Sequence, residues 1–200
     1  MFDGIINYMK HLIVIPTYNE IDNIKSIIDY IFVLYPDISI LVVDDSSPDE
    51  TSNAVKILQK KYKNLYLIIQ KNKGGLARAY INGFKWGIEN GFDLFTSIDA
   101  DFSHPPDKIS NAIELINSGA DIASASRYIN LGNTKETDWL KKYLSVFGNK
   151  YARFILGKSL TDWTEGFNTL LPYNESETPA ENASILVAIP IKKSDFKLIT

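Results

Sequence analysis

The sequence predicts an α/β fold, built on a mostly parallel sheet with helices on both faces. Short apolar runs alternate along the chain with stretches whose apolar residues recur at helical spacing. The short runs are apolar throughout, which is typical of strands buried on both faces of a parallel sheet. Polar clusters follow these runs, at the expected carboxyl ends of the strands, where such sheets bind ligands.

The first 62 residues are expected to hold two strands and two helices. The first strand, His11–Pro16, is a short apolar run closed by a proline. Asn19 can cap the helix that follows, with Asp22 three residues later and isoleucines at helical spacing on its buried face. The second strand, Ile38–Val43, leads into the turn-rich sequence DDSSPDET and a helix around Ala54 to Tyr62.

Three further strands follow. LYLIIQ (Leu65–Gln70) is the third strand, and the glycine pair of KNKGGL leads into a helix through Gly87. FDLFTSI (Phe92–Ile98) is the fourth strand, followed by a helix from Pro106 to Asn117 and by DIASASRY (Asp121–Tyr128) as the fifth. Strands alternating with helices predict a parallel sheet with right-handed crossovers.

Composition narrows the class of protein. With 200 residues, 45% of them hydrophobic, the chain can bury the core of one domain. The net charge of −3 argues against a nucleic-acid partner, and the lack of cysteine excludes disulfides and thiolate metal sites. No apolar run approaches the roughly 18 residues of a membrane span, and MFDGIINYMK lacks the basic start of a signal peptide. A cytoplasmic location is therefore expected.

Two carboxylates close the fourth strand in the sequence DLFTSIDADFSHPP. Asp99 and Asp101, two residues apart in an extended chain, point to the same side and would repel each other. A divalent cation removes this conflict, and Mg²⁺ or Mn²⁺ is commonly held by one or two carboxylates together with substrate phosphates. Ser103 and His104 follow closely. An isolated D-x-D is more often a solvated loop, but its place at a strand end favours a cation site.

The other strand ends carry candidate ligand contacts. Asp45 is an acid at a strand end, suited to a base or a ribose, whereas Ser47 and Asp49 better fit a cap on the next helix. In PTYNE, Tyr18 offers an aromatic face and Glu20 an acceptor, although a simple strand-to-helix turn explains these residues equally well. The glycine pair of KNKGGL is a weak phosphate-loop signal, and close helix packing explains it as well.

Six motifs occur in an order that resembles the polyprenol-phosphate (dolichol-phosphate) mannose synthases, which are inverting GT-A glycosyltransferases of family 2. The motifs are IPTYNE, VVDDSSPDET, KGGLARAYINGF, DADFSHPPD, SRY and DWTEGF, between Leu12 and Phe167. The resemblance implies a single GT-A domain over residues 1–200, with a Rossmann-like, mostly parallel sheet in a three-layer α/β/α arrangement. Residues 1–10 would be an N-terminal extension.

The resemblance also implies substrates and site residues. The donor would be GDP-mannose, the acceptor a polyprenyl phosphate and the cofactor Mg²⁺ or Mn²⁺. The nucleotide-sugar positions would be Pro16, Tyr18, Glu20, Val43, Asp45, Asp99, Ala100, Asp101, Arg127 and Lys197. The metal positions would be Asp99, Asp101 and Ser103, and the catalytic positions Asp101 and Arg127.

Residues 138–157, DWLKKYLSVFGNKYARFILG, carry aromatic residues at near-helical spacing with lysines and arginine among them. Such a stripe suits a membrane interface, and a helix packed on the sheet suits it equally. By the resemblance this segment lines the acceptor site, with Lys141 or Lys142 on the lipid phosphate. We expect peripheral contact with the cytoplasmic face of a membrane (plasma membrane or endoplasmic reticulum), directly or through a membrane partner subunit.

The tail departs from the family pattern. Asn168 stands where the family has an arginine, and residues 168–200 form an atypical, shortened tail in which Lys197 corresponds to the terminal lysine. Two alternatives therefore remain open. One keeps the fold but uses another nucleotide sugar, such as UDP-glucose, or another acceptor. The other is a catalytically impaired homologue that binds a nucleotide sugar without turnover.

Overall fold

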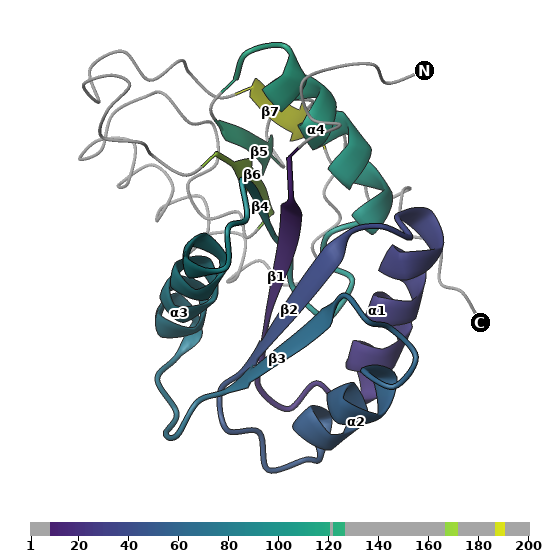
Figure 1. Ribbon diagram of the computed structural model, residues 1–200, viewed down its shortest axis with the longest axis vertical. Coiled ribbons are helices and arrows are strands. Elements are labelled where there is room, and N and C mark those ends of the chain that lie inside the picture. Colours follow the sequence, from purple (N-terminus) through teal and green to yellow (C-terminus); the bar gives the residue numbers. More distant parts are fainter. Residues whose placement is uncertain (1–8, 121, 127–166, 172–186, 191–200) are drawn as a thin grey trace, which may run out of the picture.

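The computed structural model describes residues 9–120, 122–126, 167–171 and 187–190, which form a sheet with helices on both faces (Figure 1). The strands are β1 (His11–Thr17), β2 (Ser39–Asp44), β3 (Leu65–Ile69), β4 (Leu94–Ser97), β5 (Ile122–Ser126), β6 (Asn168–Leu170) and β7 (Val187–Pro190). The helices are α1 (Ile21–Leu34), α2 (Thr51–Leu58), α3 (Leu76–Glu89) and α4 (Ile109–Asn117), the last preceded by a 3₁₀ turn at Pro106–Lys108.

The sheet is mostly parallel, as expected. Its strand order is β3-β2-β1-β4-β6-β5-β7. β1 lies between β2 and β4 and runs parallel to both, while β2 pairs with β3 and β5 with β7, also in parallel. β6, which the sequence did not predict, lies antiparallel between β4 and β5 and joins the two parallel parts.

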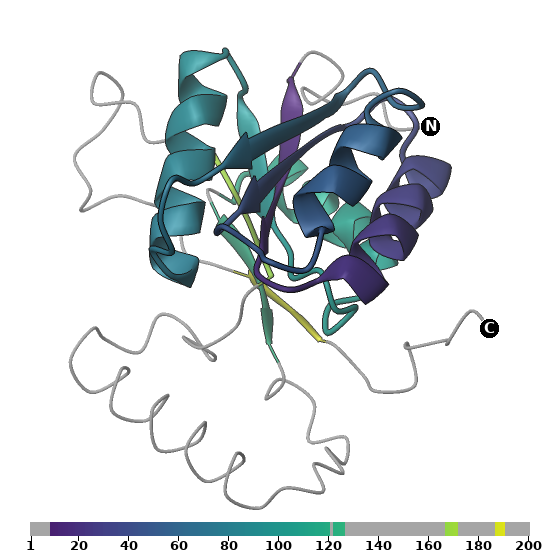
Figure 2. The ribbon, with the colours of Figure 1, turned by 90° about the horizontal axis from the view of Figure 1, so that it is seen from below.

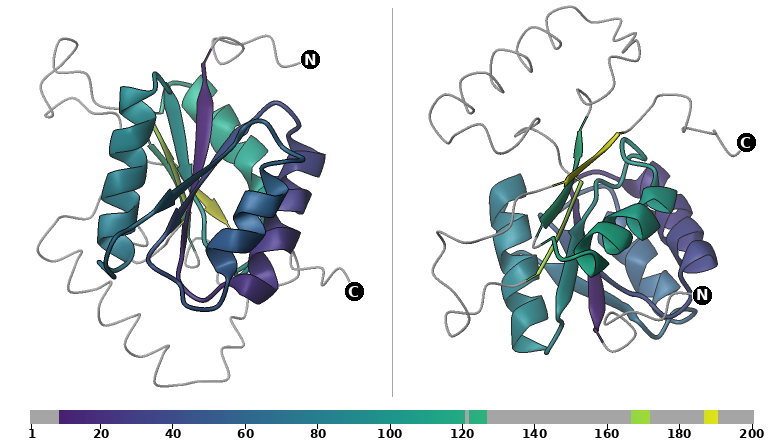
Figure 3. Two further views of the ribbon diagram at one scale, coloured as in Figure 1. Left: turned by 60° about the horizontal axis from the view of Figure 1, so that its bottom comes forward. Right: turned by 90° about the horizontal axis from the view of Figure 1, so that it is seen from above.

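The three layers follow from the alternation of side chains along buried strands. On β1, Ile13 and Ile15 pack with α1, α2 and α4, whereas Leu12 and Val14 face α3. Both sets are fully buried. Figures 2 and 3 show α3 on one side of the sheet and the other three described helices on the opposite side. The predicted three-layer α/β/α arrangement is confirmed.

Helix α3 approaches the sheet closely because its inner face is made of small residues, Ala79, Gly83 and Gly87. A Cβ atom added at Gly83 would lie 2.6 Å from Cγ1 of Val14, and one at Gly87 would overlap Phe95. The close contact fixes α3 on the strands that carry the polar clusters.

The expected cap of α1 is wrong. Asn19 has a φ of 61°, in the left-handed region, and the helix begins only at Ile21, with no side-chain cap of its own. The β2–α2 loop supplies the acceptors instead. Ser47 Oγ accepts a hydrogen bond from the Asn19 amide at 3.0 Å, and Asp49 Oδ2 accepts one from the Ile21 amide at 3.1 Å. Because β1 and β2 are neighbours, their carboxyl-terminal loops meet, and a distant residue replaces the local cap.

Helix α2 begins earlier than expected, at Thr51 rather than near Ala54. Asp49 Oδ1 accepts both the amide of Thr51 (3.1 Å) and its hydroxyl (2.6 Å), as in the predicted capping role. Of the expected segments, residues 138–157, almost all of 1–10 and most of 168–200 lie outside the described part of the chain. No helix among the described residues is both long and apolar enough to cross a membrane.

Candidate functional site

A pocket of about 280 Å³ lies where β1, β2 and β4 end. Its lining residues are Pro16, Thr17, Tyr18, Glu20, Asp45, Leu76, Ala79, Asp99, Ala100 and Asp101. In the register of the sheet Thr17 pairs with Asp44 and Val14 with Ser97, so the three strands deliver their following residues to one edge. The structure thus brings most of the predicted site residues that it describes into a single pocket.

Asp99 is held from two sides. Its Oδ1 accepts a hydrogen bond from the Tyr80 hydroxyl at 3.2 Å, and its Oδ2 lies 3.5 Å from Nδ1 of His104. Burial of Tyr80 and the adjacent Asp99 carboxylate raise the pKa of the phenol, so the hydroxyl stays protonated and donates. His104 is buried against the ring of Phe167, with 6.1 Å between ring centroids.

Asp101 is exposed, and its Oδ1 accepts the amide of Ser103 at 2.8 Å. Ser103 itself is not among the residues that line the pocket. Two carboxylates facing one pocket are a donor set that would suit Mg²⁺ or Mn²⁺, which proteins usually hold through one or two carboxylates together with substrate phosphates. Among the described residues there is no group of three or more His, Cys, Asp or Glu side chains placed to hold a metal.

The adjacent acids at the end of β2 have separate environments. Asp44 is fully buried and accepts the Thr17 hydroxyl and the Ser47 amide, each at 3.0 Å, which ties the two strand-end loops together. Asp45 lines the pocket. The sequence reasoning selected Asp45 and missed the structural role of Asp44, which a polar residue inside a buried strand would have signalled.

Asp45 also gives a structural reason for the glycine pair Gly74 and Gly75, whose backbone amides it binds. Its Oδ1 accepts the Gly74 amide (2.7 Å) and the Gln70 side chain (2.9 Å), and its Oδ2 accepts the Gly75 amide (2.7 Å). Gly75 has a φ of 83°, which disfavours other residues. Both glycines thus turn their amides toward Asp45, and Gly74 also lies close to α3, where an added Cβ would overlap the Arg78 side chain.

Tyr18 and Glu20 sit at the rim of the pocket. The Tyr18 side chain is partly open, at 39% exposure, and the Lys73 ammonium lies 3.5 Å from the centre of its ring. Glu20 accepts a hydrogen bond from Asn23 at 2.9 Å. An aromatic face beside a carboxylate can take a heterocyclic base by stacking and hydrogen bonding.

Other predicted positions lie elsewhere. The Val43 side chain is fully buried against α3 and does not line the pocket, so only its backbone is near the site. Arg127, Lys141, Lys142 and Lys197 fall outside the described residues. Tyr80 was missed as a contact of Asp99, because nothing in the sequence links a helix residue to a strand end 19 positions away.

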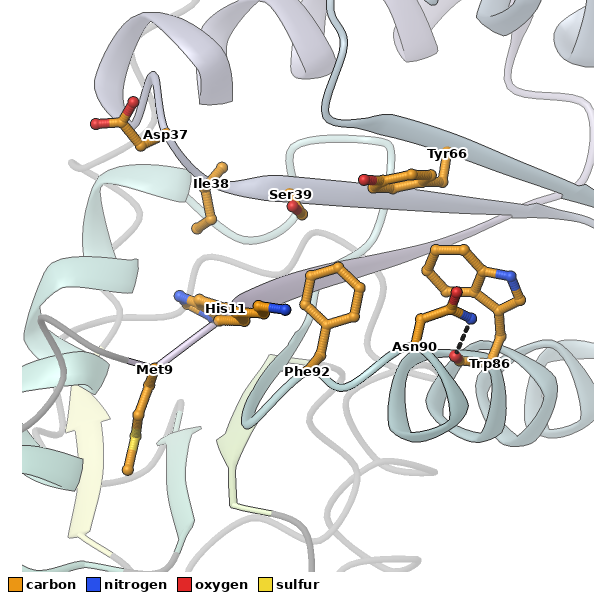
Figure 4. Close-up of a pocket in the computed structure, with 10 residues that line it drawn as sticks. Met9, His11, Asp37, Ile38, Ser39, Tyr66, Trp86, Asn90 and Phe92 are labelled. Atoms are coloured by element: carbon orange, nitrogen blue, oxygen red, sulfur yellow. Dashed lines mark hydrogen bonds between the residues drawn. The ribbon is translucent and has the colours of Figure 1, made fainter.

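A larger cavity, of about 620 Å³, opens at the opposite edge of the sheet (Figure 4). His11, Tyr66, Trp86 and Phe92 line it, and no predicted site residue does. The His11 ring is hydrogen-bonded to Thr96 at 2.7 Å, and burial lowers its pKa to about 3, so it is neutral near pH 7. One acid, Asp37, lines this cavity, in place of the several acids that line the pocket at the carboxyl ends of the strands.

Residues 12–171 match the family described as glycosyl transferase family 2, four positions beyond the span expected from the motifs. A polyprenol monophosphomannose synthase of Mycolicibacterium smegmatis is 37% identical over 79% of this chain and 60% of its own length. An undecaprenyl-phosphate mannosyltransferase of Micrococcus luteus is 35% identical over 80% of this chain and 65% of its own. The chain thus spans less than two thirds of the length of these curated relatives.

Solved structures share the fold. A mannosyltransferase of Pyrobaculum calidifontis, in complex with GDP-mannose and Mn²⁺, superimposes with a TM-score of 0.55 at 18% identity. The alignment covers 82% of this chain and 44% of the other. At this identity the match speaks for the fold alone.

Proposed function

Because the chain belongs to glycosyl transferase family 2, we propose that it transfers mannose from GDP-mannose to the phosphate of a polyprenyl lipid, with inversion at the sugar. Both curated relatives carry polyprenyl-phosphate mannosyl transfer in their names, and the solved neighbour was determined with GDP-mannose.

One observation carries the proposal: an aromatic rim and a pair of carboxylates open into the same pocket. Tyr18, Glu20 and Asp45 lie on the β1 and β2 side, suited to a base and its ribose, while Asp99 and Asp101 follow β4. A nucleoside diphosphate matches these two ends of the pocket, because its base lies at one end of the molecule and its anionic phosphates at the other. A donor can therefore lie across the strand ends with its sugar beyond Asp101.

The charge of the pocket supports a cation-dependent reaction. Glu20, Asp45, Asp99 and Asp101 all line it, and none of the lining residues among the described ones is a lysine or arginine. A diphosphate entering alone would be repelled. Asp99 and Asp101 would hold Mg²⁺ or Mn²⁺, which neutralises the charge that develops on the departing diphosphate.

The reaction needs little proton transfer. An ionised oxygen of the acceptor phosphate forms the new bond to the anomeric carbon, while the bond from that carbon to the donor phosphate breaks and GDP leaves with the bonding electrons. A phosphate monoester is mostly ionised near pH 7, with a second pKa of about 6. The protein's task is to orient the two substrates and to exclude water.

The acceptor side of the proposal rests on sequence position. Arg127 follows β5 directly and would contact a phosphate through its forked guanidinium, and Lys141 or Lys142 would bind the lipid phosphate. Lys197 would add a cation near the donor. With a polyprenyl acceptor the protein would need contact with a membrane, and we propose a peripheral position on the cytoplasmic face, with or without a partner subunit.

A transfer assay with radiolabelled GDP-mannose, a short polyprenyl phosphate and Mn²⁺ tests the proposal. We expect an organic-soluble mannosyl lipid that disappears when the metal is chelated. UDP-glucose run in parallel identifies a different donor. Binding of GDP-mannose without product would instead favour a nucleotide-sugar-binding homologue, and the absence of both would refute the proposed function.

A further inference from the structure

Tyr80 contacts β4 in two ways: through Phe84, its ring packs toward Phe95 of the strand, and its hydroxyl bonds to Asp99 just after the strand. Its ring stacks on Phe84 with 5.9 Å between centroids, and Phe84 packs edge-on against Phe95 at 5.7 Å. The Tyr80 hydroxyl then donates to Asp99, four residues beyond Phe95 in the chain. The strand that carries the acid therefore also positions the ring that holds it.

The helix beneath this ring has little freedom to move. Gly83 lies so close to β1 that an added Cβ would meet Val14 at 2.6 Å. A Cβ added at Gly87 would overlap the Phe95 ring. Tyr80 is partly buried on the same helix and directly follows Ala79, which lines the pocket. A hydroxyl placed by such packing can fix the rotation of a carboxylate, which a flexible surface donor would not do.

We propose that Tyr80 is a positioning residue that sets the orientation of the Asp99 carboxylate toward a divalent cation and the diphosphate of a nucleotide. The inference rests on the proposed function, because it assigns the pair Asp99 and Asp101 to a metal-bound diphosphate. Tyr80 touches neither: it acts through Asp99 alone. His104, 3.5 Å from the other oxygen of Asp99, bounds the carboxylate on its second side.

Loss of the hydroxyl should weaken cation binding without unfolding the protein. Tyr80→Phe keeps the ring and its packing on Phe84 and removes only the hydrogen bond. Removing a group that orients a metal ligand typically costs about 10- to 100-fold in metal affinity. We expect a reduction of at least about 10-fold in Mn²⁺ affinity. Tyr66→Phe, a half-buried tyrosine at the opposite edge of the sheet, is the matched control.

The experiment measures Mn²⁺ binding by electron paramagnetic resonance, and GDP binding by calorimetry with and without Mn²⁺. For Tyr80→Phe we expect weaker Mn²⁺ binding and weaker Mn²⁺-dependent GDP binding, with metal-free GDP binding and melting temperature unchanged. Placed on Asp99→Asn, the same substitution should have no further effect, because it acts through that carboxylate.

Four outcomes would overturn the inference. They are equal Mn²⁺ affinity in wild type and Tyr80→Phe, an equal loss in Tyr66→Phe, a loss that persists unchanged on Asp99→Asn, and a wild type that binds no Mn²⁺. If Tyr80→Phe weakens Mn²⁺ binding while wild type fails to bind GDP, the positioning role stands and the proposed function falls.

Discussion

Asp45→Asn should loosen the glycine loop beside the pocket. The Asp45 carboxylate, at 4% exposure, accepts three hydrogen bonds, from Gln70, Gly74 and Gly75. An amide keeps one acceptor oxygen, which can retain the two donors on Oδ1. Its NH₂ group then faces the Gly75 amide, donor against donor, and this bond is lost.

The size of the effect follows from the lost bond. A hydrogen bond to a charged group contributes roughly 1.5–3 kcal/mol, and the two remaining bonds weaken when the charge is removed. We therefore expect about 2–3 kcal/mol less stabilisation of the loop. At 1.4 kcal/mol per factor of ten, the loop should open about 30- to 150-fold more often.

Hydrogen exchange of the Gly74 and Gly75 amides, followed by NMR, measures this opening directly. Exchange at both should accelerate by that factor in Asp45→Asn, while amides in β1 change little. Asp37→Asn, at an exposed acid distant from the loop, is the control. An acceleration of less than about threefold, which corresponds to roughly 0.7 kcal/mol, would show that Asp45 does not hold the loop.

Three further outcomes are expected. Asp101→Ala should abolish mannosyl-lipid formation in the radiolabel assay while its melting temperature stays near that of wild type, because Asp101 is exposed; unchanged turnover would remove the metal assignment. Gly83→Ala should lower the free energy of unfolding by about 1–3 kcal/mol in urea titrations, because its Cβ would press on Val14; a stabilised variant would contradict the close packing. Stability should also fall from pH 7 to pH 5, because the unfolded chain protonates His11 below about 6.5 and the folded chain, with a pKa of about 3, does not. The fall contributed by His11 should approach about 2 kcal/mol at pH 5, and His11→Gln should remove it.

The regular part of the fold was predictable because its signals are local. Buried parallel strands such as Ile38–Val43 are apolar on both faces, and α3 and α4 show helical spacing, so their existence follows from composition within a short window. β6 was not predictable in this way. Its three residues, Asn168–Leu170, carry no period, and they become a strand only through pairing with Phe95–Ser97 and Ile122–Ser124.

In the candidate site, too, the residues marked by local sequence were predictable and the contacts between distant elements were not. Asp99, Asp101, Asp45 and Tyr18 follow strands directly, so the rule that ligands lie at strand ends identifies them. Contacts between different elements could not be predicted from the sequence. The Tyr80 hydroxyl reaches Asp99 because Gly83 lets α3 lie close to the sheet. The predicted cap of α1 was wrong for the same reason, since Asp49, which accepts the Ile21 amide, comes from another loop.

The antiparallel strand β6 has a consequence for how such a protein can diversify. β5 ends at Ser126 and β6 begins at Asn168, and the two strands lie antiparallel side by side with Ser124 and Asn168 in register. The two ends of the connection between these strands are thus held together, and the entropy cost of closing a loop rises by only about 0.6 kcal/mol for each doubling of its length. Evolution can lengthen, shorten or replace that connection while the pocket at β1, β2 and β4 stays intact. Under the proposed function, in which Lys141 or Lys142 of this connection would bind the lipid phosphate, a lineage could in this way exchange one recipient molecule for another and keep the same activated sugar.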